Sequence, residues 1–403
     1  MRGRLPRGPG PGLLLVAVLL VSVNLRGAIA AVSPVLPQIR TELAMSPAVA
    51  GLLTTLPVLC FAAFAPVATW IGRRAGLERA IGVGCLALAA ATALRVLDGP
   101  PVLLAGTLVV GAAMTIGNVL VPVVVKRDFG ERAGTVTGLY TAALCAGAAA
   151  TAALTAPAAG LSSWRTALAG WGALALLAAV VWAVATRRRG GRPGAAPSPA
   201  AGVAAPGVWR HPTAWAVTGL LGAQSVTYYA VTAWLPTLLV DEVGVDLETA
   251  GLGMSVFQVL GIVGTLGVAA LAGRRPQQVW LGAGVAGTWG LMIVGLLLWP
   301  SAWILWTVVG GVAQGAGVAL AFTLLVLRSH DESAASALSG MSQLVGYTLG
   351  ATGPVVVGAL YAASGGWTAP LVLLLVVTAG MGVAGVAAGK DTSVGAPAVR
   401  ASR

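Results

Sequence analysis

The stretch VSVNLRGAIAAVSPVLP, residues Val21–Pro37, lies inside a long apolar run and yet carries Asn24 and Arg26. Arg26 is the one charge that falls in the middle of a hydrophobic segment of this sequence. A guanidinium does not lose its proton in a protein, so within a membrane it needs an anion or several hydrogen-bond acceptors beside it. The nature of that partner is therefore the main question about function.

The composition on either side of this stretch is that of a membrane protein. Of the 403 residues, 57% are hydrophobic and only 9% are charged, whereas soluble domains carry roughly a quarter charged residues. Spans of about 20 residues leave room for about twelve helices in a chain of this length. We therefore predict an all-α membrane protein with twelve transmembrane helices in two six-helix halves.

The apolar runs divide the chain into five parts. The sequence predicts an N-terminal tail at 1–12, a first half at 13–186, a basic linker rich in Pro, Gly and Ala at 187–212, a second half at 213–388, and a tail at 389–403. Ala28-Ile29-Ala30 resembles a signal-peptide cleavage site, but a polytopic chain can use its first span uncleaved. The expected spans are 13–38, 48–71, 80–97, 102–125, 134–158, 166–186, 213–239, 249–272, 279–299, 302–327, 335–362 and 368–388.

The basic residues between the spans predict the orientation. If the N-terminus is cytoplasmic, then among the lysines and arginines other than Arg26 only Arg40, Arg95 and Arg165 fall on the outer side. Cytoplasmic loops carry such an excess of Lys and Arg. We expect a multi-pass protein of the inner membrane with both termini in the cytoplasm. The net charge of +12 is then a topology signal, and it does not indicate a nucleic-acid partner.

The two halves repeat each other with a period near 200 residues. The tripeptide Ala50-Gly51-Leu52 recurs at 250–252, Arg127 recurs as Arg328, and Trp164 recurs as Trp367. Internal duplication of this kind is typical of secondary transporters, in which the substrate site lies where the repeats meet.

Polar side chains are distributed unevenly among the expected spans. Spans three, six, nine and twelve hold no Asn, Gln, Tyr, His or mid-span charge, so we expect every third helix to face lipid and the others to surround a polar cavity. Helix–helix hydrogen bonds use the same residue types, and backbone carbonyls and glutamines could satisfy Arg26 structurally. The candidate substrate-binding residues are Arg26, Asn24, Asn118, Tyr140, Gln224, Tyr228, Gln258, Gln314, Gln343 and Tyr347.

No constellation for catalysis, metal binding or a cofactor is visible. Cys60, Cys85 and Cys145 all fall inside apolar runs without metal-ligand spacing, and His211 and His330 lie in expected loops. All twelve acidic residues fall in loops or at span edges, so no carboxylate lies mid-span to carry a proton. The sequence therefore predicts neither an enzyme nor a metal or cofactor site. The absence of a sizeable soluble domain argues against a sensor.

Several stretches resemble the major facilitator superfamily, and within it the cyanate permease and 2-nitroimidazole transporter family. The resemblance covers nearly the whole chain. The superfamily's Asp-Arg-x-Gly motif between spans two and three is replaced by Arg73-Arg74-Ala75-Gly76, which lacks the aspartate. The matching stretches are NLRGAI at 24–29, GLLTTLPVLCFAAFAP at 51–66, GNVLVPVVVKRDF at 117–129, TGLYTAAL at 137–144, WLPTLL at 234–239, FQVLGI at 257–262 and GMSQLVGYTLGATGP at 340–354.

The resemblance implies a rocker-switch transporter with a central site and alternating access. Together with the residues it predicts a monomeric secondary active or facilitative transporter in the lipid bilayer, moving a small anion or small polar, cyanate-like compound that pairs with Arg26. The alternative is an efflux transporter of neutral drug-like compounds such as nitroimidazoles. We expect a cavity for such compounds to be lined by many aromatic side chains, whereas this chain has only five Phe and five Tyr. The composition therefore favours the first interpretation.

Overall fold

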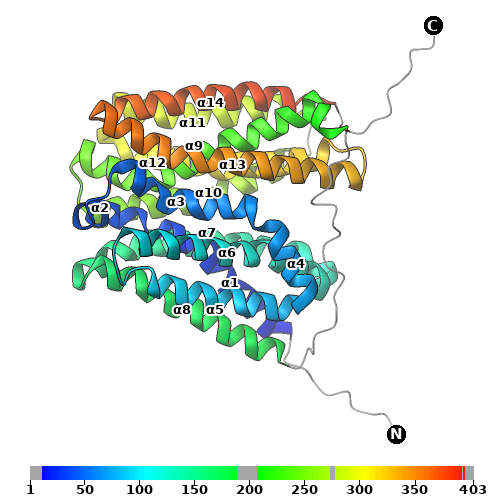
Figure 1. Cartoon of the computed structure of the whole chain (residues 1–403). Coiled ribbons are helices and arrows are strands. Elements are labelled where there is room, and N and C mark those ends of the chain that lie inside the picture. The colour runs from blue at the N-terminus through cyan, green and yellow to red at the C-terminus, as the bar shows by residue number, and fades with distance from the viewer. Residues whose placement is uncertain (1–10, 188–206, 273–276, 393, 395–403) are drawn as a thin grey trace. The chain divides into compact units, whose positions relative to one another are not determined.

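The computed structural model describes residues 11–187, 207–272, 277–392 and 394, and these residues form fourteen α-helices and no β-strand. The predicted all-α class is confirmed. Most of the expected tails and linker lies outside the described residues. Figure 1 shows long helices that run side by side within each part of the chain.

The chain forms two compact units. The first comprises the described residues of Met1–Met45, Leu59–Pro197 and Asp246–Ser255, and the second those of Ser46–Val58, Ser198–Val245 and Val256–Arg403. Each unit therefore includes a short piece from the other half of the sequence. The first unit holds α1 (Pro11–Ala30), α2 (Leu36–Glu42), α4 (Ala65–Ala75), α5 (Leu77–Leu94), α6 (Pro100–Phe129), α7 (Ala133–Leu161) and α8 (Trp164–Thr186).

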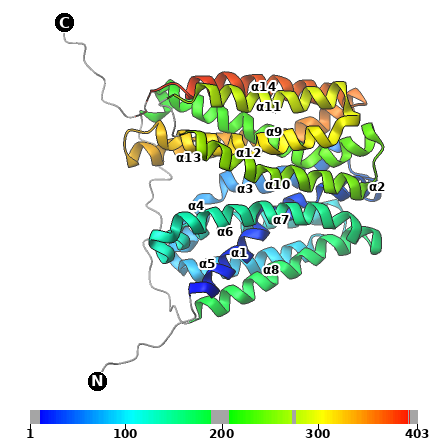
Figure 2. The same ribbon diagram turned by 180° about the vertical axis from the view of Figure 1, so that it is seen from behind.

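The second unit is built around one long, buried helix, α9 (Pro212–Val243), which packs against α12, α13 and α14. The helices α11 and α14 also pack on each other, as both views show (Figure 2). The helices of the second unit are α9, α11 (Val279–Leu298), α12 (Trp303–Leu327), α13 (Glu332–Ser364) and α14 (Thr368–Ala388). Two further helices contribute to both units, α3 (Pro47–Ala63) and α10 (Leu247–Ala272).

The number of membrane spans is close to the predicted twelve. By length and composition, ten of the described helical segments can cross a membrane, or eleven if the bent pair α3 and α4 counts as one span. The helix α9 has 32 residues and is long enough, but it is not one of these ten, and it carries polar side chains such as Gln224 and Tyr228. Twelve is reached only if α9 and the bent pair are both counted.

Prolines explain two breaks that the sequence analysis treated as continuous spans. In the first span α1 ends at Ala30, and the chain passes through the 3-10 turn Ser33–Val35 before α2. Pro34 has no N–H to donate to the Ala30 backbone oxygen, which accepts the Ser33 hydroxyl at 3.2 Å. Between α3 and α4 the axis bends by 58° next to Pro66, which has no N–H to donate to the preceding turn.

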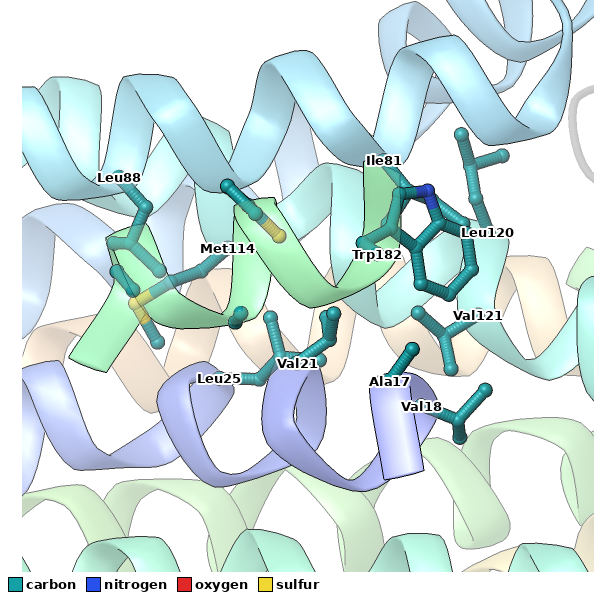
Figure 3. Packing of buried hydrophobic residues seen from close by; sticks show 14 of the residues in the cluster. Ala17, Val18, Val21, Leu25, Ile81, Leu88, Met114, Leu120, Val121 and Trp182 are labelled. Carbon is teal, nitrogen blue, oxygen red and sulfur yellow. The ribbon is translucent and has the colours of Figure 1, made fainter. Parts of the chain in front are cut away.

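The core of the first unit lies between α1, α5, α6 and α8. Leu25 of α1, Met114 of α6 and Trp182 of α8 are almost fully buried (Figure 3). The Trp182 indole donates to the backbone oxygen of Glu78 at 2.8 Å, so this ring also fixes the start of α5. On its other side α1 approaches α7 so closely that any side chain at Gly147 would collide with the backbone oxygen of Val23.

The repeated tryptophans have the same role in the two units. Trp164 donates its indole N–H to Glu42 Oε2 at 2.5 Å, and Trp367 donates to Asp241 Oδ2 at 3.0 Å. In each unit a carboxylate at the end of the first span thus receives a hydrogen bond from the residue that begins or precedes the last helix. The predicted repeat is therefore visible in the contacts as well as in the sequence.

Replacing Trp367 with phenylalanine is expected to lower the free energy of unfolding by about 1–2 kcal/mol, because a hydrogen bond to a charged group is lost while most of the buried ring remains. Thermal unfolding of the purified protein in detergent measures this. Trp299→Phe is the control, since Trp299 is 64% exposed and should change little. Equal losses in both variants would contradict the assigned contact.

Candidate functional site

Arg26 lies well inside the first membrane-spanning segment. That segment covers Gly12–Glu42, so about 20 Å of helix separate Arg26 from its N-terminal end. On the other side α1 ends at Ala30, and the 3-10 turn and α2 follow within the same segment. Its side chain is half-buried and contacts other groups of the protein. A long side chain cannot reach the membrane surface over that distance, so the charge has to be stabilised inside the protein.

Asn24 is directed into the core of the first unit. Its amide donates to the Leu20 backbone oxygen at 2.8 Å, and its side chain is only 9% exposed. With Leu25, Cys85 and Gly117 it lines a cavity of about 10 Å³, which is too small for any cargo beyond a water molecule. Asn24 therefore acts on helix packing in this structure.

Asn118 and Tyr140 are brought together. The Tyr140 hydroxyl on α7 donates to Asn118 Oδ1 on α6 at 3.2 Å, so this predicted pair forms one polar group on two helices. Tyr140 is 8% exposed, and Asn118 is half-buried. Among the hydrogen bonds found for the described residues, none involves the amide nitrogen of Asn118. This donor is therefore available to a ligand.

Gln224 and Gln314 form a satisfied network within the second unit. Gln224 is fully buried, donates from Nε2 to the Gln314 backbone oxygen at 3.0 Å, and accepts the Trp289 indole N–H at Oε1 at 2.8 Å. Gln314 Nε2 points to the backbone of Phe257 at 3.4 Å. Both glutamines thus connect α9, α10, α11 and α12, the role that interhelical hydrogen bonds have in membranes.

Gln258 is bonded at only one end of its amide. Its side chain is fully buried on α10, Oε1 accepts the Tyr228 hydroxyl at 3.2 Å, and Nε2 has no hydrogen-bond partner among the described residues. Exchanging the amide nitrogen and oxygen would move the unpartnered position to the other atom without removing it. A buried polar atom with unused bonding capacity is costly and is therefore a candidate for ligand binding.

Aromatic rings surround this amide. The Tyr228 and Tyr229 ring centroids lie 4.9 Å apart in an edge-to-face pair, and Tyr228 stacks on Phe257 at 6.4 Å. Phe257 in turn contacts Trp289, with centroids 6.0 Å apart. The Tyr228 hydroxyl, which bonds to the Gln258 amide, therefore belongs to a group of aromatic rings in the second unit.

The remaining predicted residues lie on α13. Gln343 Nε2 donates to Ser339 Oγ one turn earlier at 2.8 Å, and both Gln343 and Tyr347 are half-buried. Residues four apart share one face of a helix, so Gln343 and Tyr347 form a polar stripe on α13. The structure does not join this stripe to Gln258 by a direct hydrogen bond among the described residues.

Sequence reasoning missed the contribution of Trp289. We expected every third helix to face lipid, yet Trp289 on α11 is fully buried and bonds to Gln224, and Trp171 on α8 donates to Thr155 at 2.9 Å. The polar count left out tryptophan, whose indole N–H needs an acceptor when buried, although α8 and α11 also expose large apolar side chains such as Leu177 and Leu291. A mid-span Trp was the signal.

The described residues hold no group of three or more His, Cys, Asp or Glu side chains that could bind a metal ion. The three cysteines are buried and unpaired to one another. What the two units offer is a set of hydrogen-bonding groups and one mid-span charge, which suits binding and release of a small molecule.

A family model described as "Major Facilitator Superfamily" matches residues 18–351. "Uncharacterized transporter YycB" of Bacillus subtilis (strain 168) is 37% identical over 382 residues, 94% of either chain. "2-nitroimidazole transporter" of Escherichia coli (strain K12) is 34% identical over 95% of this chain and 96% of its own length. "Cyanate transport protein CynX" of the same strain is 27% identical over 88% and 91%.

Solved structures share the fold. A bacterial homologue of the human lysosomal transporter Spinster, in an inward-facing and unoccupied conformation, superimposes with a TM-score of 0.75 at 17% sequence identity, covering 96% of this chain and all of the other. At that identity the likeness concerns the fold alone. The family model and the curated relatives, which are transporters, agree with the prediction that the chain is not an enzyme.

Proposed function

Because this chain belongs to the major facilitator superfamily, we propose that it carries a small anion or small polar compound of cyanate-like size across the bacterial inner membrane by alternating access. It is a multi-pass membrane transporter, and its cargo is a small molecule. The direction of transport follows the gradient of the cargo itself. The mid-span segments hold no carboxylate or histidine that would couple transport to protons.

The observation that supports an anionic cargo is the position of Arg26. It is the only charge in the middle of a span, and the acidic residues of the chain lie at span ends or in loops. Arg26 also contacts other groups of the protein, and the proposal requires only that an entering anion takes over part of that role. Asn118 and Tyr140, which belong to the same unit as Arg26, would then orient the cargo through hydrogen bonds.

A second candidate is a neutral planar compound that carries a hydrogen-bond acceptor. The unpartnered Gln258 amide among the rings of Tyr228 and Phe257 supports it, because stacking and one hydrogen bond suffice to hold a flat heterocycle. A relative with 34% identity is named for 2-nitroimidazole. In this case the charge of Arg26 would serve the structure.

Uptake into proteoliposomes distinguishes the two candidates. We expect the parent protein to take up labelled cyanate, and Arg26→Ala to lower the initial rate at least about tenfold, since a buried charge–charge contact of about 1.4 kcal/mol or more is lost. Arg26→Lys keeps the charge but not the planar fork and should retain part of the rate. Labelled 2-nitroimidazole is measured in parallel.

The control is Arg73→Ala, which removes an exposed arginine at the end of α4 and should transport as the parent does. Each variant is first compared with the parent by thermal unfolding, so that rates refer to folded protein. Uptake of 2-nitroimidazole that survives Arg26→Ala supports the second candidate. Cyanate uptake that survives it contradicts charge pairing by Arg26.

For the membrane arrangement we propose a monomer with both termini in the cytoplasm. The distribution of Lys and Arg between the spans supports this orientation. The charges that flank the described spans, such as Arg73, Arg74 and Arg127, lie on the same side as the N-terminus in this arrangement.

A further inference from the structure

Arg95 is an almost fully buried arginine whose guanidinium is only weakly bonded. It follows the last residue of α5 and is 1% exposed. Its Nη1 lies 3.5 Å from Thr107 Oγ1, at the limit of a hydrogen bond. Nε and Nη2 have no hydrogen-bond partner among the described residues. The sequence analysis had counted Arg95 on the outer side, near the end of the expected span 80–97, and gave it no role.

A second buried arginine shows what a satisfied guanidinium looks like in this protein. Arg328 is 2% exposed, and it donates from Nε to the Ala388 backbone oxygen at 2.9 Å and from Nη2 to the Gly389 backbone oxygen at 3.0 Å. It also bonds to Gln278 Oε1. Arg95 has the same burial without these acceptors, and a buried charge without compensation is costly.

The charge of Arg95 persists despite its burial. Arg95 lies just beyond the span Leu77–Leu94, and desolvation lowers the pKa of its guanidinium to about 10, so the group remains protonated at neutral pH. The acidic residue nearest to Arg95 in the sequence is Asp98. It is exposed, and its Oδ1 accepts the Gly99 backbone N–H at 2.7 Å. The chain itself therefore supplies no anion at this position among the described residues.

The unbonded atoms define the ligand that would fit. Nε and Nη2 form one edge of the planar guanidinium, and their N–H groups run parallel, which matches two oxygens of a carboxylate or phosphate. Thr92 lies one turn before Arg95 on the same face of the helix and is 2% exposed. Thr107 faces Arg95 from α6. The Thr107 hydroxyl donates to the Leu103 backbone oxygen at 2.7 Å and accepts from Nη1, so the Nε and Nη2 edge is the part of this group left for an anion.

Glycine at position 106 makes this arrangement possible. Any side chain there would collide with the Cβ atom of Arg95, so the backbone of α6 comes close enough for Thr107 to reach the guanidinium. The surroundings are typical of a lipid-facing surface, since Leu94 is 56% and Leu97 is 71% exposed. The end of a span is also the depth at which lipid phosphates lie.

From this geometry we propose that Arg95, whose Nη1 faces Thr107, binds an oxyanion through its Nε and Nη2 edge. The oxyanion is supplied either by a phospholipid headgroup or by a small soluble phosphate or carboxylate. This site is separate from the residues assigned to transport and does not depend on the proposed cargo. The bound oxyanion neutralises the buried charge between the end of α5 and the first part of α6. The occupancy of the site therefore controls the stability of that helix pair.

The test is thermal unfolding of the purified full chain in an uncharged, lipid-free detergent with chloride as the only anion. One arm adds phosphatidylglycerol, and the other adds inorganic phosphate at matched ionic strength. We expect the melting temperature of the parent to rise by about 4 °C or more at saturation in at least one arm. A response to the lipid alone identifies the headgroup, and a response to phosphate alone identifies a soluble oxyanion.

Two variants decide whether Arg95 carries the response. Arg95→Met should melt no lower than the parent without an oxyanion and should not respond in either arm. Arg328→Met is the control, which should melt well below the parent and still respond. Arg95→Lys keeps the charge but has no pair of parallel N–H groups, so its melting temperature should rise only weakly when the lipid or phosphate is added. This variant also tests the proposal if the methionine variant does not fold. A parent that responds in neither arm, or an Arg95→Met variant that responds fully, overturns the proposal.

Discussion

Replacing Gln258 with methionine is expected to lower uptake of the cargo at least about tenfold while the protein melts within a few degrees of the parent or higher. Gln258 is fully buried, and one end of its amide has no partner. Removing an unsatisfied buried amide costs the fold little, because an apolar side chain of similar shape needs no hydrogen bond. If that amide binds the cargo, the loss appears in transport, where one hydrogen bond of about 1.4 kcal/mol corresponds to a factor of ten.

The matched control is Gln224→Met. Gln224 has the same burial, but both ends of its amide are bonded, to Trp289 Nε1 and to the Gln314 backbone oxygen. Its replacement leaves the Trp289 N–H buried without an acceptor, so we expect a loss of about 2 kcal/mol or more in the free energy of unfolding. A comparison of the two variants separates a binding amide from a structural one.

The hydroxyl of Tyr228 completes the argument. It donates to Gln258 Oε1, so Gln258→Met removes one of its acceptors. The double variant Gln258→Met with Tyr228→Phe removes both partners and should be at least as stable as Gln258→Met alone. Thermal unfolding and initial uptake rates are measured on the same preparations. A Gln258→Met protein that transports normally, or that unfolds as readily as Gln224→Met, would falsify the assignment.

The fold was largely predictable because the apolar runs that determine it are spread over the whole chain. Long apolar runs and the distribution of basic residues require no knowledge of contacts, and the repeat of Trp164 as Trp367 is visible by inspection. The breaks next to Pro34 and Pro66 were missed, since a proline inside an apolar run is tolerated in many membrane helices and only the packing decides where the axis bends.

The roles of individual polar residues were less predictable. Gln224 and Gln258 are the same residue type, lie on expected inner helices and are equally buried, yet one is fully bonded and the other is not. That difference depends on which backbone oxygens and indole groups surround each amide, and these belong to helices far away in the sequence. The burial of Arg95 was missed for the same reason, because it results from packing against Gly106.

Replacing Arg328 with methionine is expected to lower the free energy of unfolding by about 3 kcal/mol. Its guanidinium bonds to Gln278 on one side and to Ala388 and Gly389 on the other, and it is nearly inaccessible to solvent. The variant leaves several buried acceptors without a donor, each of which costs about 1 kcal/mol or more. Thermal unfolding in detergent measures the loss.

The same substitution at the corresponding position of the first unit should have a much smaller effect. Arg127 pairs with Glu78 at 2.6 Å and with Asp128 at 2.7 Å, but its side chain is 28% exposed. Water can replace such partners, so Arg127→Met is expected to cost about 1 kcal/mol or less. Similar losses in both variants would mean that solvent exposure does not set the contribution of these arginines.

A local consequence distinguishes Arg328 further. Its backbone oxygen accepts the Val394 N–H at 2.7 Å, and the His330 N–H donates to the Val394 oxygen at 3.1 Å, so the segment after α14 is held against the end of α12. Arg328→Met removes the side-chain bonds to Ala388 and Gly389 that position this segment. Limited proteolysis should therefore cut the variant after Gly389 faster than the parent, whereas Arg127→Met should be cut there at the parent's rate.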